Sequence, residues 1–173
     1  MDIQVADYVN VEKRASELGL NAPSGIAILP RNFDTAEVAD ELIHESTAPT
    51  IRVLWRQAGV EETRLEKEGM KFPQGVKKSW EWVGPIIFIS QAMLTNAAIP
   101  LTINMISSYL YDLWKGHIND AEITAEFVIE CVTHTKQEDR REYKRITFKG
   151  SPKEWKAFNA ANKLKELGGK SSK

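Results

Sequence analysis

The pattern of apolar and polar positions in the amino-terminal third predicts a helix, a strand, a helix and a strand in turn. Apolar residues first recur at helical spacing, at Tyr8, Val11, Ala15 and Leu18. Residues 26–29 form a short apolar run that ends at a proline, which is typical of a buried strand. Residues 35–45 combine a capping-box sequence with one apolar face and predict a helix, whereas residues 50–55 are β-branched and apolar and predict a strand. This order favours a parallel strand pair joined by a crossover helix.

The middle of the chain, residues 82–111, contains no charged side chain, although 27% of all residues are Asp, Glu, Lys or Arg. Because burying charge is costly, such a run marks backbone that leaves bulk water. Pro85 and Pro100 divide it into two predicted helices, residues 86–98 and 101–114. Each would be about 20 Å long, short of the roughly 30 Å hydrocarbon core of a bilayer. Polar residues are scattered through both halves, which favours helices packed within protein.

The carboxy-terminal third predicts a β-hairpin followed by a helix. Apolar residues alternate with mostly polar ones over 123–131, and after a polar turn residues 143–149 form a returning strand. Ser151 begins a helix with a first-turn proline and a capping-box acid. The apolar stripe of that helix is Trp155, Phe158, Ala161, Leu164 and Leu167. The strand and the helix both need apolar cover, so we expect contacts of Ile123, Phe127 and Ile129 with Trp155 and Phe158.

These elements predict one α+β domain with a small mixed β-sheet packed by helices, including a central apolar helical pair. Residues 1–80 would hold the strand–helix–strand part and residues 81–116 the helical pair. Residues 117–167 would hold the hairpin and the final helix, followed by a flexible tail at 168–173. A chain of 173 residues is long enough to bury a sizeable core.

Composition and charge are those of an ordinary globular protein, with 42% hydrophobic residues and a formal net charge of −1. From residue 136 onward there are twelve Lys or Arg and five Asp or Glu, a net of +7, so the remainder carries −8. A basic end of this kind is more often a solvated surface than a nucleic-acid contact. The lone Cys131 suits a reducing compartment, and the first residues lack the pattern of a secretory signal. We therefore expect a cytoplasmic protein.

The residue types of catalysis and metal binding do not occur in a recognisable arrangement, so we expect no catalytic residue, no cofactor and no metal. Glu41 and His44 would lie on adjacent turns of a helix, but a zinc-protease helix needs a second His where Ala48 stands. We interpret His44 as the polar edge of an amphipathic helix. Cys131 and His134 would point to opposite faces of a strand, which favours a core cysteine over a catalytic pair.

Aromatic side chains flank the uncharged run and are candidate interface or membrane residues: Trp80, Trp82, Tyr109, Tyr111 and Trp114. Lysines lie just outside them, as at a membrane interface. Large aromatic residues also serve in cores and protein interfaces, and the short, polar-dotted helices favour this second interpretation.

Four basic residues are candidate contacts to an anionic partner: Arg141, Lys144, Arg145 and Lys149. They lie on or beside the returning strand, where Arg145 and Thr147 share the outer face with Tyr143. A basic sheet face with an aromatic residue can stack a base, but the paired aromatic residues of RNA-binding sheets are missing here.

From residue 83 to 167 the predicted order is two apolar helices, an alternating strand, a returning strand and a final helix, with the join ITFKGSP at 146–152. This layout resembles the small effector-associated components encoded beside effector enzymes in bacterial conflict (defence) systems. The resemblance implies a non-catalytic adaptor or sensor-side component and carries over no functional residue. The amino-terminal part departs from the layout.

We therefore expect a non-enzymatic adaptor or regulatory component of a bacterial defence system. Its expected partner is another protein, and a homo-oligomer is an open alternative. One alternative is a membrane-active effector that inserts residues 82–114 as a helical hairpin. A second alternative is a nucleic-acid or nucleotide binder that uses the basic carboxy-terminal third.

Overall fold

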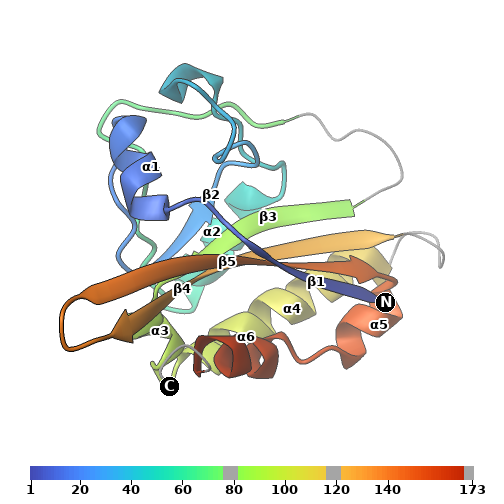
Figure 1. Cartoon of the computed structure of the whole chain (residues 1–173). Coiled ribbons are helices and arrows are strands. Elements are labelled where there is room, and N and C mark those ends of the chain that lie inside the picture. Colours follow the sequence, from blue (N-terminus) through green and yellow to red (C-terminus); the bar gives the residue numbers. More distant parts are fainter. Residues whose placement is uncertain (76–81, 116–121, 170–173) are drawn as a thin grey trace.

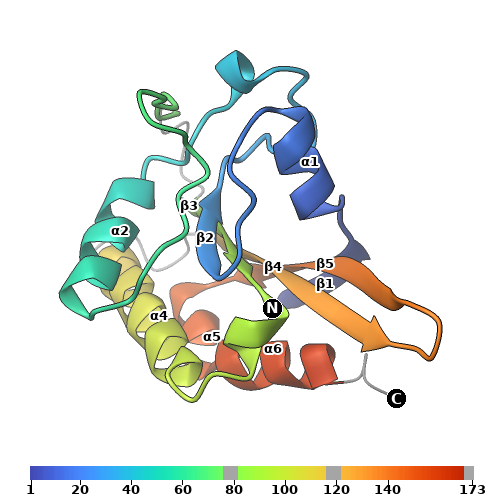
Figure 2. The same cartoon turned by 90° about the vertical axis from the view of Figure 1, so that its left-hand side faces the viewer.

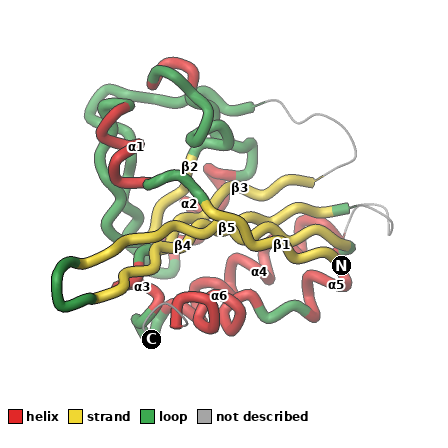
Figure 3. The backbone as a smooth tube through the Cα atoms, viewed as in Figure 1, coloured by secondary structure: helices red, strands yellow, loops and turns green. Residues whose placement is uncertain are grey.

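The computed structural model describes residues 1–75, 82–115 and 122–169. Along the chain the elements are β1 (Asp2–Asp7), α1 (Val11–Glu17), β2 (Ile26–Leu29), η1 (Ala39–Glu41), α2 (Ala48–Gln57), β3 (Trp82–Ile89), α3 (Gln91–Leu94), α4 (Ile99–Lys115), β4 (Ile123–His134), β5 (Asp139–Gly150), α5 (Pro152–Ala157) and α6 (Ala160–Gly169). From the end of β2 to residue 75 the chain is mostly loop, apart from η1 and α2 (Figure 3).

The strands form one mixed sheet in the order β1-β5-β4-β3-β2 (Figure 1). The β3–β4 pair is parallel, and the other three neighbouring pairs are antiparallel. The predicted α+β class and mixed sheet are therefore confirmed. Strand β4 is the central strand of the sheet. It forms a long hairpin with β5, in which twelve residues of each strand are paired.

Each face of the sheet carries its own buried cluster of apolar side chains. Helices α2, α4, α5 and α6 cover one face, and α1 together with loops from the amino-terminal half covers the other (Figure 2). The alternation of strand side chains divides β3 between the two clusters, since Ile87 and Ile89 belong to the helical side and Ile86 and Phe88 to the loop side. The central strands are thus buried on both faces.

Several predicted elements are confirmed. Helix α1, strand β2, the β4–β5 hairpin and a helix starting after Ser151 all form. The predicted packing of the hairpin on the last helices is also confirmed, because Phe127 stacks on Trp155 and Phe148 on Phe158. The last helix is divided in two, since Phe158 has an extended backbone with ψ 123° between α5 and α6.

The predicted helical pair in the uncharged run is wrong in its first half. Residues 82–89 form β3, a short helix α3 follows, and only the second half is a long helix, α4. Pro85 does not begin a helix but lies in β3 where the register with β4 shifts, between Val83 and Ile86. A strand tolerates proline at such an irregularity. Within the described residues, no helix is both long and apolar enough to cross a membrane.

The predicted strand–helix–strand unit is also wrong. Residues 35–45 contain only the short η1, and residues 50–55 belong to the helix α2, not to a strand. Pro49 occupies the first turn of α2, and Ile51 and Trp55, one turn apart, bury the same helical face. Strand β2 pairs antiparallel with β3 in place of the expected parallel partner.

The first strand, β1, was not predicted. It lies at the edge of the sheet, pairs with β5, and leaves most of its side chains exposed.

Candidate functional site

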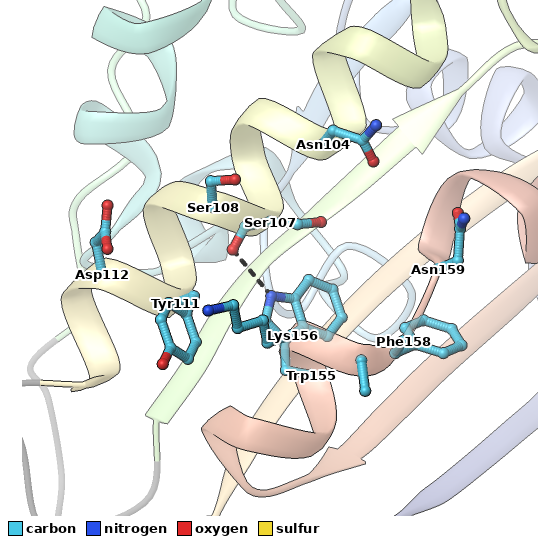
Figure 4. A pocket seen from close by; sticks show the side chains of 10 residues that line it. Asn104, Ser107, Ser108, Tyr111, Asp112, Trp155, Lys156, Phe158 and Asn159 are labelled. Atoms are coloured by element: carbon cyan, nitrogen blue, oxygen red, sulfur yellow. Dashed lines mark hydrogen bonds between the residues drawn. The ribbon is translucent and has the colours of Figure 1, made fainter.

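A groove of about 590 Å³ runs between α4 and α5 on the helical side of the sheet (Figure 4). Its α4 wall consists of Asn104, Ser107, Ser108, Tyr111 and Asp112. Its second wall consists of Trp155, Lys156, Ala157, Phe158 and Asn159. Half of these side chains are polar but uncharged, and three of the lining residues, Tyr111, Trp155 and Phe158, are aromatic.

The α4 wall follows from the sequence of the helix. Its buried face carries Ile99, Ile103, Ile106 and Leu110 at spacings of three and four residues, and all four belong to the core. The neighbouring stripe carries the pairs Asn104 and Ser108, and Ser107 and Tyr111, each one turn apart. Three of the polar residues that interrupt the uncharged run, Asn104, Ser107 and Ser108, therefore face the groove.

The second wall is held in place by a capped helix and a buried tryptophan. Ser151 and Glu154 form a complete capping box at the start of α5. Trp155 is 1% exposed, and its Nε1 donates a hydrogen bond of 3.1 Å to the backbone carbonyl of Ser107 (Figure 4). Phe158 packs on Phe148 with ring centroids 5.2 Å apart. These contacts fix the width of the groove, because they tie α5 both to α4 and to the sheet.

One end of the groove contains a cation–π contact. The ammonium group of Lys156 lies 4.8 Å from the centroid of the Tyr111 ring. Lys156 and Asp112 are the two charged residues in the lining, so their formal charges cancel. The groove therefore offers hydrogen bonds and aromatic surface without a surplus of either charge.

Of the five aromatic candidates, the structure describes side-chain contacts for Tyr109 and Tyr111. Tyr109 and Tyr111 are half-buried on α4 and pack against the core, and Tyr111 also lines the groove. Trp80 lies outside the described residues. Trp82 begins β3 and Trp114 lies in α4, and for these two the structure describes the backbone alone.

Three of the four basic candidates form intramolecular ion pairs. Arg141 contacts Glu12 at 2.7 Å, and Lys144 contacts Asp7. The guanidinium of Arg145 contacts both carboxylate oxygens of Glu126, at 2.7 and 2.6 Å, and lies 5.8 Å from the ring centroid of Tyr8. These cations attach the amino-terminal segments to the hairpin. The fourth candidate, Lys149, is exposed beside Asp2 in the strand register.

The prediction that Tyr143 lies on an open basic face of the returning strand is wrong, because this residue is only 4% exposed. Its ring lies in the loop-side cluster near Phe88, at a centroid distance of 6.3 Å. Burial, together with the neighbouring charge of Glu130, raises the pKa of its phenol to about 12. A buried ring cannot stack on a base, so the geometry that suggested nucleic-acid binding is missing here.

The interpretation of His44 as the exposed edge of a helix is also wrong. His44 is 3% exposed and forms an isolated parallel bridge with Gln74. The sequence did not predict the burial of His44, because Phe72 and Gln74, which contact it, lie about thirty positions later in a loop. It missed the α4–α5 groove for a similar reason, although the polar residues at helical spacing were a usable signal.

The chain matches no protein-family model, no curated protein and no solved structure.

Proposed function

We propose that this chain is a protein-binding module that holds an extended segment of a partner protein in the α4–α5 groove. The observation that carries this proposal is the combination of an amide side chain on each wall and hydroxyl groups on the α4 wall with aromatic residues on both walls. The volume of about 590 Å³ lies within the range of ligand clefts, roughly 300–1,000 Å³.

The chemistry of the lining suits a peptide main chain. An extended peptide presents one N–H donor and one C=O acceptor at almost every residue, and both must be satisfied when it leaves water. Asn104 and Asn159 carry a donor and an acceptor each, and Ser107 adds a hydroxyl that serves as either. Tyr111 and Phe158 offer apolar surface for side chains of the same segment.

The charge of the lining disfavours nucleic acid at this groove. Nucleic-acid affinity comes largely from cations that neutralise phosphates, and here a single lysine is balanced by Asp112. Three basic residues of the hairpin, Arg141, Lys144 and Arg145, are engaged with Glu12, Asp7 and Glu126.

Membrane insertion of residues 82–114 would require a larger rearrangement. Strand β3 would have to leave its hydrogen-bonded position between β2 and β4 and expose both buried clusters. The cost in buried apolar surface favours the protein-binding proposal. A role within a bacterial defence system stays a prediction, and the genes beside this one test it.

The proposal is tested by selecting peptides from a random library against the chain and measuring their affinity by fluorescence anisotropy. Asn104→Arg places a bulky cation in the groove at an exposed position and should weaken a selected peptide about tenfold or more. Asn162→Arg, an exposed asparagine on α6 outside the lining, is the matched control and should leave affinity unchanged. Equal binding to both variants, or a selection without binders, would contradict the proposal.

A further inference from the structure

A second cavity, of about 360 Å³, lies between α2 and the chain that returns past it over residues 64–74. Four cationic side chains line it: Arg52, Arg56, Arg64 and Lys71. One lining carboxylate, Glu66, opposes them, so the lining carries a net charge of +3 with His44 neutral. The cavity shares no lining residue with the α4–α5 groove.

A buried network organises this cluster. Glu66 Oε1 lies 3.0 Å from His44 Nε2 and 3.4 Å from Arg52 Nη2, and Glu66 Oε2 accepts a 3.2 Å hydrogen bond from Arg64 Nε. The His44 and Glu66 side chains are 4% and 5% exposed. Burial by itself raises the pKa of Glu66, but the hydrogen bonds from His44 and Arg64 and the charge of Arg52 outweigh it and lower that pKa to about 2. Glu66 is therefore ionised at neutral pH, and both of its oxygens already accept protein donors.

Two buried polar atoms beside the network lack partners. Because the ionised Glu66 can only accept, His44 Nε2 is the donor of their hydrogen bond, and the remaining atom Nδ1 has no partner among the described residues. Oγ1 of Thr47, the N-cap residue of α2, also lacks a partner and forms no side-chain cap hydrogen bond, but Thr47 does not line the cavity. Buried polar atoms are nearly always hydrogen-bonded, and His44 does line the cavity, so its unpartnered Nδ1 points to a polar group that joins the protein there. The first residues of α2, Ala48 and Pro49, line the same cavity.

The cations are only partly compensated within the protein. Arg52 also pairs with Glu62 at 2.8 Å, and Arg64 pairs with Glu66. In the part of the chain that the structure describes, Arg56 and Lys71 form no ion pair, although both line the cavity. A purely structural network would need only the paired cations. The two further cations supply charge for an external anion.

We propose that this cavity binds a phosphoryl group, either as free phosphate or as the end of a small phosphate monoester. Guanidinium groups match the oxygens of a phosphate in pairs, and lysine adds a point charge. A helix N-terminus contributes further positive potential for an anion. The small volume leaves room for the phosphoryl group and a compact organic part. This site goes beyond the proposed peptide groove and does not depend on it.

The test is isothermal titration calorimetry of the full chain with inorganic phosphate and, separately, with 5′-adenosine monophosphate, at constant ionic strength. We expect saturable binding that weakens about tenfold or more in the double variant Arg56→Gln/Lys71→Gln. Both side chains are exposed and outside the buried network, so this variant should keep the circular dichroism spectrum of the parent. The double variant Lys13→Gln/Lys165→Gln removes the same charge from exposed positions on α1 and α6, outside the cavity lining, and should change affinity less than about twofold.

The two ligands distinguish the source of the phosphoryl group. Tighter binding of the monophosphate would indicate a monoester, and tighter binding of phosphate would indicate the free ion. No saturation up to about 50 mM of either ligand, far above a millimolar dissociation constant, would overturn the proposal. Equal weakening in the two double variants would overturn it as well, because binding would then follow net charge and not this cavity.

Discussion

Phe127 in β4 and Trp155 in α5 stack with ring centroids 6.5 Å apart and planes 11° from parallel. Trp155 also meets Phe148 edge-on at 5.1 Å, and its Nε1 bonds to α4. One tryptophan thus joins the central hairpin to both walls of the α4–α5 groove. The stability of the sheet and the shape of the groove are coupled through this residue pair.

Replacing Phe127 by Ala should lower the free energy of unfolding by roughly 3–5 kcal/mol, because it leaves a cavity beneath Trp155 that the sheet cannot fill. Urea unfolding followed by tryptophan fluorescence measures the change. A loss below about 1 kcal/mol would mean that the stacked pair adds little to the core.

Ile103→Lys should unfold the chain or destabilise it by more than about 3 kcal/mol, because Ile103 is fully buried on α4 and the ammonium would lose its water there. The adjacent exposed residue supplies the control, since Asn104→Lys should change stability by less than about 0.5 kcal/mol. Circular dichroism in urea compares the two. A folded Ile103→Lys protein, beside a parent that floats with liposomes, would favour the membrane alternative.

Acid should weaken the network around His44. The pKa of Glu66 is lowered from 4.5 to about 2 in the folded chain, so its ionisation stabilises the fold above the ordinary pKa, and that contribution is lost as pH falls from about 5 toward 2. The difference in unfolding free energy between the parent and Glu66→Gln should therefore be largest near neutrality and shrink in this range. In the control variant Glu68→Gln, at an exposed neighbouring position, the free energy of unfolding should change with pH as it does in the parent. A difference that stays constant with pH would contradict the lowered pKa.

Cys131 should react slowly with thiol reagents in the folded chain. Its side chain is 3% exposed, and burial, reinforced by the charge of Glu142, raises the pKa of the thiol, so little thiolate is available. Modification by Ellman's reagent should be about a hundredfold slower in buffer than in denaturing urea. Similar rates under both conditions would place the thiol at the surface.

Local signals in the sequence determined the carboxy-terminal hairpin and the start of α5. The alternation over 123–131 and the returning strand at 143–149 are close in sequence and pair directly, so the pattern contains nearly all the information that the hairpin needs. Ser151 specifies its helix for the same reason, since both partners of its capping box lie within one turn.

Contacts between distant residues decided the rest. Strand β3 is buried on both faces, so its apolar run has no periodicity that separates strand from helix, and only pairing with β2 and β4 makes it a strand. Strand β1 is half polar and mostly exposed, and it becomes a strand by pairing with β5, where Ile3 lies opposite Phe148. The α4–α5 groove and the cavity beside α2 likewise depend on tertiary contacts, because Ser107 meets Trp155, and His44 meets Glu66, only once the chain has folded. Sequence periodicity reports which face of an element is buried, whereas the partner that buries it is chosen by the packing of the whole chain.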